Sequence, residues 1–438
     1  MKNVVITKSS PELVGLSTKP APPPPGDISL SSFDEALAFA AFTSFHIFTN
    51  GIVEPAMAIK RALSQALVYY YPIAGRANFA VGAAGERRLR ISCTGEGVGF
   101  VAATASCALD DVRLFDPPFA AVLKELAVEY AAAEGGCGED DPLLLVQVTE
   151  FACGGFVVGV TWNHVVADGL GIAQFLQAVG DLARGLPRPS VFPVSCGDGS
   201  LPALPPLVAA IEKTMLSLET KRFSYLDITI PSTMIERVKA EYAAAAGDVD
   251  SGEPCTVFEA VTAALWRSRT RAVISSDDPD APAPLVFAAN ARKHVGAEEG
   301  YYGNCVTSQV AVPTSGEVAN GDLKHVVRLI RRAKEEIPLQ FKNAGGVGGG
   351  MNGKRVEQLA GVLFGYSAFY VASWRNIGFE APDFGGGRAA RVMCHFEPTG
   401  VPSCVACLPR DGGGASVLSL CVRDEHVDAF LAELATLG

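Results

Sequence analysis

The sequence predicts an α/β protein built from two domains of similar size, each with a mixed β-sheet flanked by helices. Strand-like apolar runs occur in both halves of the chain, and segments with the apolar period of a helix lie between them. A stretch rich in proline, glycine and serine, from 186 to 206, divides the chain near its middle. With 438 residues the chain is also long for a single hydrophobic core. We therefore expect an N-terminal domain over 1–190, a crossover linker over 191–218 and a C-terminal domain over 219–438.

The first half begins with a proline-rich segment, 20–26, which we expect to be extended at the surface. A helix follows it and ends where the sequence Tyr-Tyr-Pro-Ile-Ala-Gly-Arg brings proline and glycine. Two β-type runs then surround an Ala-Cys-Gly-Gly connection, which favours a hairpin or closely paired strands. Beyond these strands, apolar residues recur at helical spacing. The expected helices are 61–70 and 172–182, and the expected strands are 143–151 and 156–162.

The second half opens with two helical patterns and continues with several strand-like runs. The first helical pattern is rich in alanine and charged residues, and the second is more apolar. We expect helices over 232–246 and 257–271, and strands over 285–289, 306–312, 389–396 and 417–422.

The composition excludes several classes of protein. With Lys+Arg 36 and Asp+Glu 47 the net charge is −11, which argues against a nucleic-acid partner. The longest mostly apolar stretch, 36–48, is interrupted by Thr43, Ser44 and His46 and is too short to span a bilayer. No secretory signal is visible, and the eleven cysteines are scattered singly, as expected for free thiols in a reducing compartment. We expect a cytoplasmic protein with neither nucleic-acid nor membrane partners.

The most informative motif is Trp-Asn-His-Val-Val-Ala-Asp-Gly, from Trp162 to Gly169. It places His164 at the end of an apolar strand, with Asp168 four residues later and a glycine where the chain turns. A base on such a rigid support is well held, and the pKa of histidine lies near neutral pH. The alternative is a core histidine beside a helix N-cap aspartate, and these eight residues alone do not decide between the two.

Three other patterns resemble functional motifs but lack an essential part. The segment 348–354 has the glycine and lysine spacing of a phosphate-binding loop, but Arg355 stands where Ser or Thr binds magnesium. Cys404 and Cys407 form a C-x-x-C motif without a second pair, in what reads as a strand interior, so no zinc site is implied. The remaining histidines have no partner at a suggestive spacing, and we interpret them as ordinary: His46, His294, His325, His395 and His426.

The chain resembles the plant BAHD acyltransferases almost from end to end. Each matching motif is weak alone, but their joint occurrence in this order is highly specific. The motifs are Tyr70-Tyr71-Pro72-Ile73-Ala74-Gly75-Arg76, His164-x-x-x-Asp168-Gly169, Thr256-Val257-Phe258-Glu259-Ala260 with Leu265-Trp266-Arg267, Asn290-Ala291-Arg292, Tyr302-Gly303-Asn304, Ser373-Trp374 and Asp383-Phe384-Gly385.

The resemblance implies the chloramphenicol-acetyltransferase-like fold, with an active-site channel between the two domains. Acyl-CoA would enter this channel from one face and the acceptor from the other, with no metal and no bound cofactor. His164 would take the proton of the acceptor as it attacks the thioester carbonyl, and Trp374 would donate its indole N–H to the oxyanion. A packed core aromatic is the alternative for Trp374.

Four further residues are implied to support the site. By analogy with the family, Asp168 points away from the substrate and pairs with Arg292, so its role is architectural. Gly169 completes the histidine motif, and Asp383 opens a segment that stabilises the fold away from the chemistry.

The sequence departs from the family pattern at three positions. Gly386 stands where the family's Asp-Phe-Gly-Trp-Gly motif has tryptophan, which we expect to affect local rigidity more than activity. Ala372 replaces a frequent threonine, which places more of the oxyanion stabilisation on Trp374. Ser195 replaces a linker tryptophan, and we interpret this change as neutral.

These observations predict a monomeric acyltransferase that moves a hydroxycinnamoyl group from CoA to the amine of a polyamine such as spermidine. Features of the N-terminal segment and the glycines after Phe384 are similar to a grass subgroup of the family, and the negative net charge slightly favours a cationic acceptor. Two alternatives remain open at this stage. One is an O-acyltransferase acting on a phenylpropanoid or terpenoid alcohol, and the other is a catalytically silent paralogue that binds a ligand.

Overall fold

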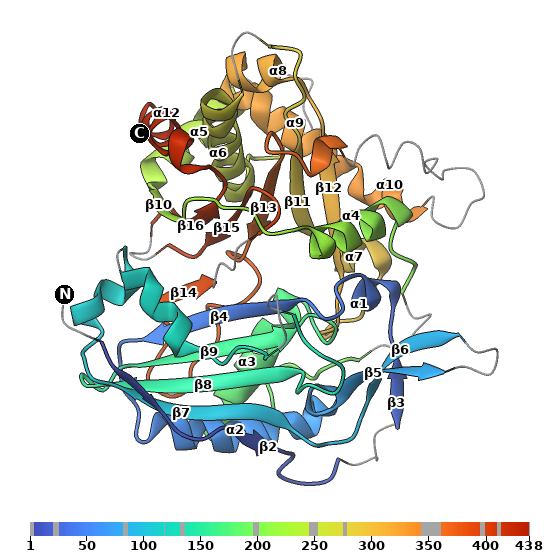
Figure 1. Cartoon of the computed structure of the whole chain (residues 1–438), viewed down its shortest axis with the longest axis vertical. Coiled ribbons are helices and arrows are strands. Elements are labelled where there is room, and N and C mark those ends of the chain that lie inside the picture. The colour runs from blue at the N-terminus through green and yellow to red at the C-terminus, as the bar shows by residue number, and fades with distance from the viewer. Residues whose placement is uncertain are drawn as a thin grey trace. The chain divides into compact units, whose positions relative to one another are not determined.

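The protein folds into two compact units, which we describe separately (Figure 1). Unit 1 contains Met1–Ala203, Gly296–Cys305 and Asn376–His395, and unit 2 contains Leu204–Val295, Val306–Arg375 and Phe396–Gly438. Unit 2 therefore begins inside the predicted linker, and unit 1 takes in two short segments from the second half of the chain. The computed structural model describes residues 4–20, 26–81, 86–117, 119–131, 136–195, 201–244, 253–274, 278–342, 361–394, 399–409 and 413–437.

Unit 1 contains a seven-stranded mixed sheet and a smaller three-stranded sheet. The strands are β1 (Ile6–Lys8), β2 (Glu12–Val14), β3 (Asp27–Ser29), β4 (Ala41–Phe48), β5 (Arg76–Val81), β6 (Arg87–Ser92), β7 (Val98–Ala105), β8 (Leu144–Phe151), β9 (Phe156–Asn163) and β14 (Arg391–Cys394). The helices are α1 (Ser32–Ala36), α2 (Pro55–Tyr69) and α3 (Gly169–Ala183), with 3-10 turns η1 (Tyr71–Ala74), η2 (Asp110–Phe115) and η3 (Phe119–Leu126).

The large sheet of unit 1 runs in the order β1-β7-β8-β9-β4-β14, with β2 also paired to β7. Only β7 and β8 are parallel, and the other neighbours are antiparallel. Every residue of β9 is buried, because β8 and β4 flank it while helices and η3 cover the sheet. Such an enclosed strand is a continuous apolar run in sequence, which is the pattern that predicted it.

Unit 2 is built on a six-stranded sheet in the order β10-β16-β15-β13-β11-β12. The strands are β10 (Leu226–Ile230), β11 (Leu285–Asn290), β12 (Val306–Ala311), β13 (Phe369–Ser373), β15 (Ser403–Cys407) and β16 (Ala415–Leu420). The helices are α4 (Pro206–Ser217), α5 (Ser232–Ala244), α6 (Val257–Val273), α7 (Arg292–Val295), α8 (Ser315–Asn320), α9 (Leu323–Glu335), α10 (Ile337–Lys342) and α12 (Val427–Ala435), with the 3-10 turn η5 (Asp424–His426).

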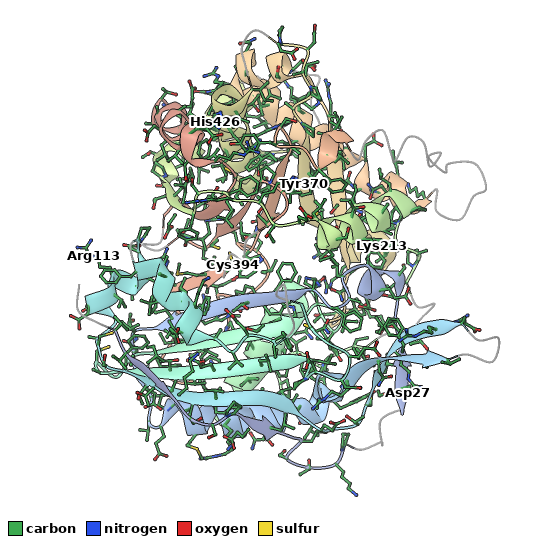
Figure 2. All side chains as sticks on the ribbon, in the orientation of Figure 1. Asp27, Arg113, Lys213, Tyr370, Cys394 and His426 are labelled. Carbon is green, nitrogen blue, oxygen red and sulfur yellow. The ribbon has the colours of Figure 1, made fainter. Side chains whose placement is uncertain are left out.

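Side chains of the unit 2 strands alternate between two apolar layers. In β13, Phe369 and Val371 pack into the core under α5, α6, α9 and α12, whereas Tyr370 packs with Ile211 of α4 on the other face. This period of two is what a sheet with both faces covered requires. Figure 2 draws the described side chains on the ribbon and labels Tyr370.

The structure confirms the predicted α/β class and most of the predicted elements. The two helices and two strands expected in the first half are present, and β8 and β9 pair antiparallel. All six elements expected in the second half occur, with ends shifted by a few residues. The segment 348–354, in which we rejected a phosphate-binding loop, lies outside the described residues, as do His395 and most of the proline-rich segment 20–26.

Two further expectations can be compared with the described residues. The ten cysteines among them are all free thiols, including Cys404 and Cys407 in β15. No helix within the described ranges is long and apolar enough to cross a membrane.

Candidate active site

His164 lies directly after β9, in a short loop that leads into α3. The His164 backbone N–H donates to the Ala40 carbonyl at 2.8 Å, which continues the pairing of β9 with the segment before β4. Asn163 Oδ1 accepts from the backbone N–H of Val165 at 3.0 Å and of Phe39 at 3.1 Å. The Trp162 indole N–H donates to the Ala167 carbonyl at 3.1 Å. The loop is therefore fixed by its own neighbours, as a precise catalytic position requires.

Asp168 joins this loop to two other segments of unit 1. Its side chain is 1% exposed, and it is the N-cap of α3, where Oδ1 accepts from the Gly171 N–H at 3.0 Å. Oδ2 accepts from the Cys305 N–H at 3.0 Å. An N-cap carboxylate near a helix N-terminus is well placed electrostatically. These contacts hold the carboxylate toward α3 and the segment 296–305, and the architectural role of Asp168 stays a prediction.

Close packing requires glycine at position 171 but less strictly at position 169. A Cβ on Gly169 would lie 2.9 Å from Ile377 Cδ1, a flexible side-chain end. A Cβ on Gly171 would lie only 1.8 Å from the Tyr302 carbonyl oxygen, which is fixed backbone. The segment 296–305 thus packs directly against the first turn of α3.

Asn304 lies at the centre of a buried network beside His164. Its Nδ2 donates to the His164 carbonyl at 2.7 Å and to Asp34 Oδ1 at 2.9 Å, while its backbone N–H donates to Asp34 Oδ1 at 3.2 Å. Asp34 Oδ2 accepts from the backbone N–H of Ser31 at 3.0 Å and from its hydroxyl at 2.7 Å. Burial raises the pKa of Asp34, and the hydrogen bonds from Ser31 and Asn304 oppose that rise.

The imidazole of His164 is enclosed but not charged. The residue is 8% exposed, and the ring of Phe42 meets it edge-on with centroids 4.8 Å apart. Burial lowers the pKa of His164, while the charge of Asp168 and hydrogen bonding with Asn304 act in the opposite direction without cancelling it. A histidine with a lowered pKa is neutral at pH 7, which is the form that accepts a proton.

Asp383 organises the glycine-rich segment near the C-terminal end of unit 1. Its Oδ1 accepts from the Gly385 and Gly387 N–H groups at 2.7 and 2.9 Å, and Oδ2 accepts from Arg184 at 3.4 Å. Burial opposes ionisation, but these donors keep the pKa of Asp383 below its ordinary value. A Cβ on Gly386 would lie 2.8 Å from the Asn50 carbonyl oxygen, so this backbone has no room for the family's tryptophan.

The other two predicted site residues lie in unit 2. Arg292 begins α7, and its backbone N–H donates to Asn290 Oδ1 at 3.0 Å. Trp374 directly follows β13 and is half-buried, and its backbone N–H donates to the Ala406 carbonyl at 2.8 Å. Each backbone is thus tied to its own sheet, which agrees with a fixed position for the side chain.

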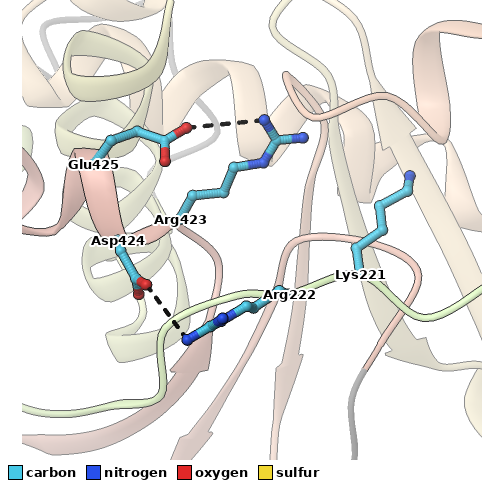
Figure 3. A pocket seen from close by; sticks show the side chains of 5 residues that line it. All are labelled: Lys221, Arg222, Arg423, Asp424 and Glu425. Atoms are coloured by element: carbon cyan, nitrogen blue, oxygen red, sulfur yellow. Dashed lines mark ion pairs between the residues drawn. The ribbon is translucent and has the colours of Figure 1, made fainter.

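A surface depression of about 370 Å³ in unit 2 contains none of the predicted site residues (Figure 3). Lys221 and Arg222 line it from one segment, and Arg423, Asp424 and Glu425 from another. Its two ion pairs, Arg222 with Asp424 and Arg423 with Glu425, span 4.0 and 3.9 Å at exposed positions, where such pairs contribute little stability. Among the described residues, no group of His, Cys, Asp or Glu side chains is arranged to hold a metal ion.

The sequence model of the Transferase family matches residues 6–436. The chain is 43% identical to Acyl transferase 15 of Oryza sativa subsp. japonica, over 99% of both chains. The chain belongs to this family. It is a plant BAHD acyltransferase, and such enzymes use acyl-CoA as the donor.

Other relatives and solved structures agree with this assignment. The acyltransferase is 34% identical to myricetin 3-O-glucosyl 1,2-rhamnoside 6'-O-caffeoyltransferase AT1 of Crocosmia x crocosmiiflora, over 98% of both chains. It is 30% identical to piperamide synthase of Piper nigrum, over 99% of this chain and 93% of that one. The crystal structure of vinorine synthase has a TM-score of 0.72 at 19% identity, over 99% and 98% of the two chains. F. graminearum TRI101 with coenzyme A and T-2 mycotoxin has a TM-score of 0.71 at 17% identity, over 94% and 100%. These two structures confirm the predicted fold.

Sequence reasoning did not find the role of Asp34, and it quoted Asn304 only as part of a motif. Ser31 and Asp34 do have the S-x-x-D spacing of a capping box, which the structure confirms at the start of α1. That signal predicts a helix start, but it carries no information about the distant loop that Asp34 supports in this acyltransferase.

Proposed function

We propose that this acyltransferase moves a hydroxycinnamoyl group from CoA to the amine of a polyamine such as spermidine, with His164 as the general base. The observation that carries the proposal is the position of His164: it lies at the end of an enclosed strand, in a loop held by several hydrogen bonds, where burial lowers the pKa of the imidazole. A base with these properties is ready to accept a proton without being reoriented.

In the proposed reaction, the neutral amine attacks the thioester carbonyl carbon, and His164 takes the proton that the nitrogen loses. The carbonyl π electrons move to oxygen, and the tetrahedral intermediate has an oxyanion. When the intermediate collapses, the C–S bond breaks, and the CoA thiolate receives the proton from the imidazolium. The products are an amide and free CoA, and His164 is neutral again.

The names of two relatives support a hydroxycinnamoyl donor and the formation of an amide bond. One relative is a caffeoyltransferase, and caffeoyl is a hydroxycinnamoyl group. Another is a piperamide synthase, whose product name is that of an amide. The net charge of −11 adds a slight preference for a cationic acceptor.

The second candidate is transfer to an alcohol, and it is favoured by a specific observation. The Crocosmia relative, which is more similar to this chain than the piperamide synthase, is named as a 6'-O-caffeoyltransferase. An alcohol acceptor would use the same base and the same thioester chemistry, so the geometry of His164 serves both candidates.

The site roles below come from the resemblance, and the oligomeric state and localisation come from the two-domain organisation and the composition. Trp374 donates an indole N–H to the oxyanion, Arg292 and Asp383 support the fold of the site, and the enzyme acts as a monomer in the cytoplasm. Acyl-CoA and the acceptor are its small-molecule partners.

Release of CoA from a panel of acyl-CoAs and acceptors tests whether the chain is active. The next step compares spermidine with an aromatic alcohol, using one hydroxycinnamoyl-CoA at about pH 6 to pH 10. An aliphatic amine with a pKa near 10.4 is neutral in only about 10⁻³ of molecules at neutral pH, so its rate should climb with pH. With an alcohol the rate should level off once His164 is neutral. Preference for the alcohol with a plateau would overturn the polyamine proposal, and no CoA release with any pair would favour a silent paralogue.

A further inference from the structure

The orientation of the Asn304 side-chain amide is fixed by its neighbours. One end of this amide meets the Asp34 carboxylate at 2.9 Å and the His164 carbonyl at 2.7 Å. Both neighbouring atoms can only accept hydrogen bonds when Asp34 is ionised, so the end that meets them must be the NH₂ group. Both protons of Nδ2 are engaged in these two hydrogen bonds, and Oδ1 points away from Asp34 and from the His164 carbonyl.

Two atoms then remain buried without a hydrogen-bond partner among the described residues: Asn304 Oδ1 and His164 Nδ1. They belong to side chains that are already joined through the His164 carbonyl. One is an acceptor only, and the other donates in one of the two neutral tautomers of histidine. A buried donor and a buried acceptor left unpaired at one place would each be costly.

We propose that Asn304 is a positioning residue that selects the tautomer of His164. Its Oδ1 accepts the proton on Nδ1, and this leaves Nε2 unprotonated to take the proton of the acceptor. The inference rests on the proposed role of His164 as the base, because only a base needs one particular ring nitrogen to be free. Hydrogen bonding with Asn304 also counts among the influences that raise the pKa of His164 against the larger effect of burial.

Asp34 has a second positioning role in this arrangement. It accepts from both the backbone N–H and the Nδ2 of Asn304. The carboxylate therefore prevents a flip of the amide that would exchange Oδ1 and Nδ2. The carboxylate is held in turn by the N–H and hydroxyl of Ser31, at the start of α1. A carboxylate at one end of an amide polarises it and makes its oxygen a better acceptor.

Asp168 is a poorer candidate for this role, although it is close in sequence. Its two oxygens accept from the backbone N–H groups of Gly171 and Cys305, which hold the carboxylate toward α3 and the segment 296–305. The carbonyl oxygen of His164 itself already accepts from Asn304. Asn304 Oδ1 is therefore the acceptor best placed to set the tautomer.

The decisive measurement is nitrogen NMR of the imidazole rings in the full-length enzyme labelled with ¹⁵N-histidine. The chain has six histidines, and a His164→Gln variant assigns the resonances of His164. We expect Nδ1 to be protonated and Nε2 unprotonated at neutral pH. Asn304→Leu, which keeps the volume but has no acceptor, should shift the ring toward a mixture of tautomers. Asp34→Asn, which can present an NH₂ group to Asn304, should do so to a smaller extent.

Kinetics give a second readout. Asn304→Leu should lower kcat by about 10- to 100-fold, less than loss of the base itself, with little change in KM. The matched control is Asn163→Ala, which loosens the same loop through the N–H groups of Phe39 and Val165 but leaves Oδ1 of Asn304 in place. It should reduce stability and keep the Nδ1-protonated tautomer.

An Nε2-protonated ring in the wild-type enzyme, or a tautomer that is unchanged in a folded Asn304→Leu variant, would overturn the inference. The tautomer is measured without substrate, so this failure is distinct from a failure of the proposed function. That second failure would appear as full turnover in His164→Ala, whatever the spectra show.

Discussion

Buried ionisable side chains in the two units offset the cost of burial in opposite ways. In unit 2, Glu259 is 1% exposed and pairs with Arg331 at 3.0 Å and Lys334 at 2.7 Å. Burial opposes its ionisation, but these partners lower the pKa of Glu259 to about 2. In unit 1, His164 and His46 have no carboxylate at ion-pair distance among the described residues, and burial lowers the pKa of both.

The difference between the paired charges and the neutral histidines indicates two different roles. The Glu259 cluster keeps its charges and neutralises them, at the first turn of α6 and against α9, so it holds helices together. The two buried histidines of unit 1 are instead uncharged, so their imidazole nitrogens can accept protons. A helix anchor benefits from permanent charges that are paired, whereas a base must be neutral before it acts.

The largest effect should follow from removing His164. His164→Ala should lower turnover by about 10²–10⁴, the usual contribution of a positioned general base. Folding should be retained, because the buried Nδ1 has no partner to lose other than the one proposed here. Initial rates and the melting temperature measure the two effects. His46→Gln is the control at the other buried histidine of unit 1, which lies opposite Val158, well away from His164 at the end of β9. Equal loss of turnover in both variants would contradict a specific role for His164.

Removing Glu259 should lower the stability of the fold and leave the catalytic step unaffected. Glu259→Ala leaves the buried guanidinium of Arg331 without its carboxylate, and we expect a loss of about 3–5 kcal/mol in the free energy of unfolding. Urea unfolding measures it.

Glu317 is a matched control, because it is also a capping-box glutamate but is exposed. It accepts from the Thr314 N–H at 2.9 Å, as Glu259 does from Thr256 at 2.8 Å. Glu317→Ala should cost only about 1 kcal/mol, the value of a helix cap. If both variants lost the same amount, burial would not distinguish the two glutamates.

Trp374 tests whether unit 2 also takes part in the chemistry. Trp374→Phe keeps most of the aromatic volume but removes the indole donor. Turnover should fall by about 10²–10³, a guide from the loss of one oxyanion donor in another enzyme, while affinity for acyl-CoA changes little. Steady-state kinetics together with acyl-CoA binding separate the two. If only the affinity for acyl-CoA fell, Trp374 would contact the substrate without donating to the oxyanion.

Local patterns predicted the supports of the site, but not the contacts that complete it. The strand before His164 and the helix after Asp168 follow from apolar periodicity, because each buries one continuous face. Asn304 reaches His164 from 140 positions further along the chain, and β14 pairs with β4 although hundreds of residues separate them. Such contacts leave no periodic signal, so no reading of neighbouring residues could have found them.

The smallest effect concerns the contribution of buried His46 to stability in acid. His46 lies in β4, with Ser44 Oγ 3.1 Å from Nε2 and the ring of Phe379 edge-on at 5.1 Å, and burial lowers its pKa from 6.5 to about 3. Between these two pH values the unfolded chain binds a proton that the folded chain does not, so the stability present above pH 6.5 is lost as the pH falls toward 3. At 1.36 kcal/mol per pH unit, His46 should account for about 2 kcal/mol of the loss between pH 6.5 and pH 5. Urea unfolding at several pH values gives the free energy of unfolding as a function of pH. In His46→Gln, the part of this pH dependence that comes from His46 should be absent. His294→Gln, at an exposed position in α7, controls for loss of an imidazole as such. If the pH dependence is unchanged in His46→Gln, His46 is protonated in the folded state. The contrast between the neutral histidines of unit 1 and the charged cluster of unit 2 would then rest on His164 alone.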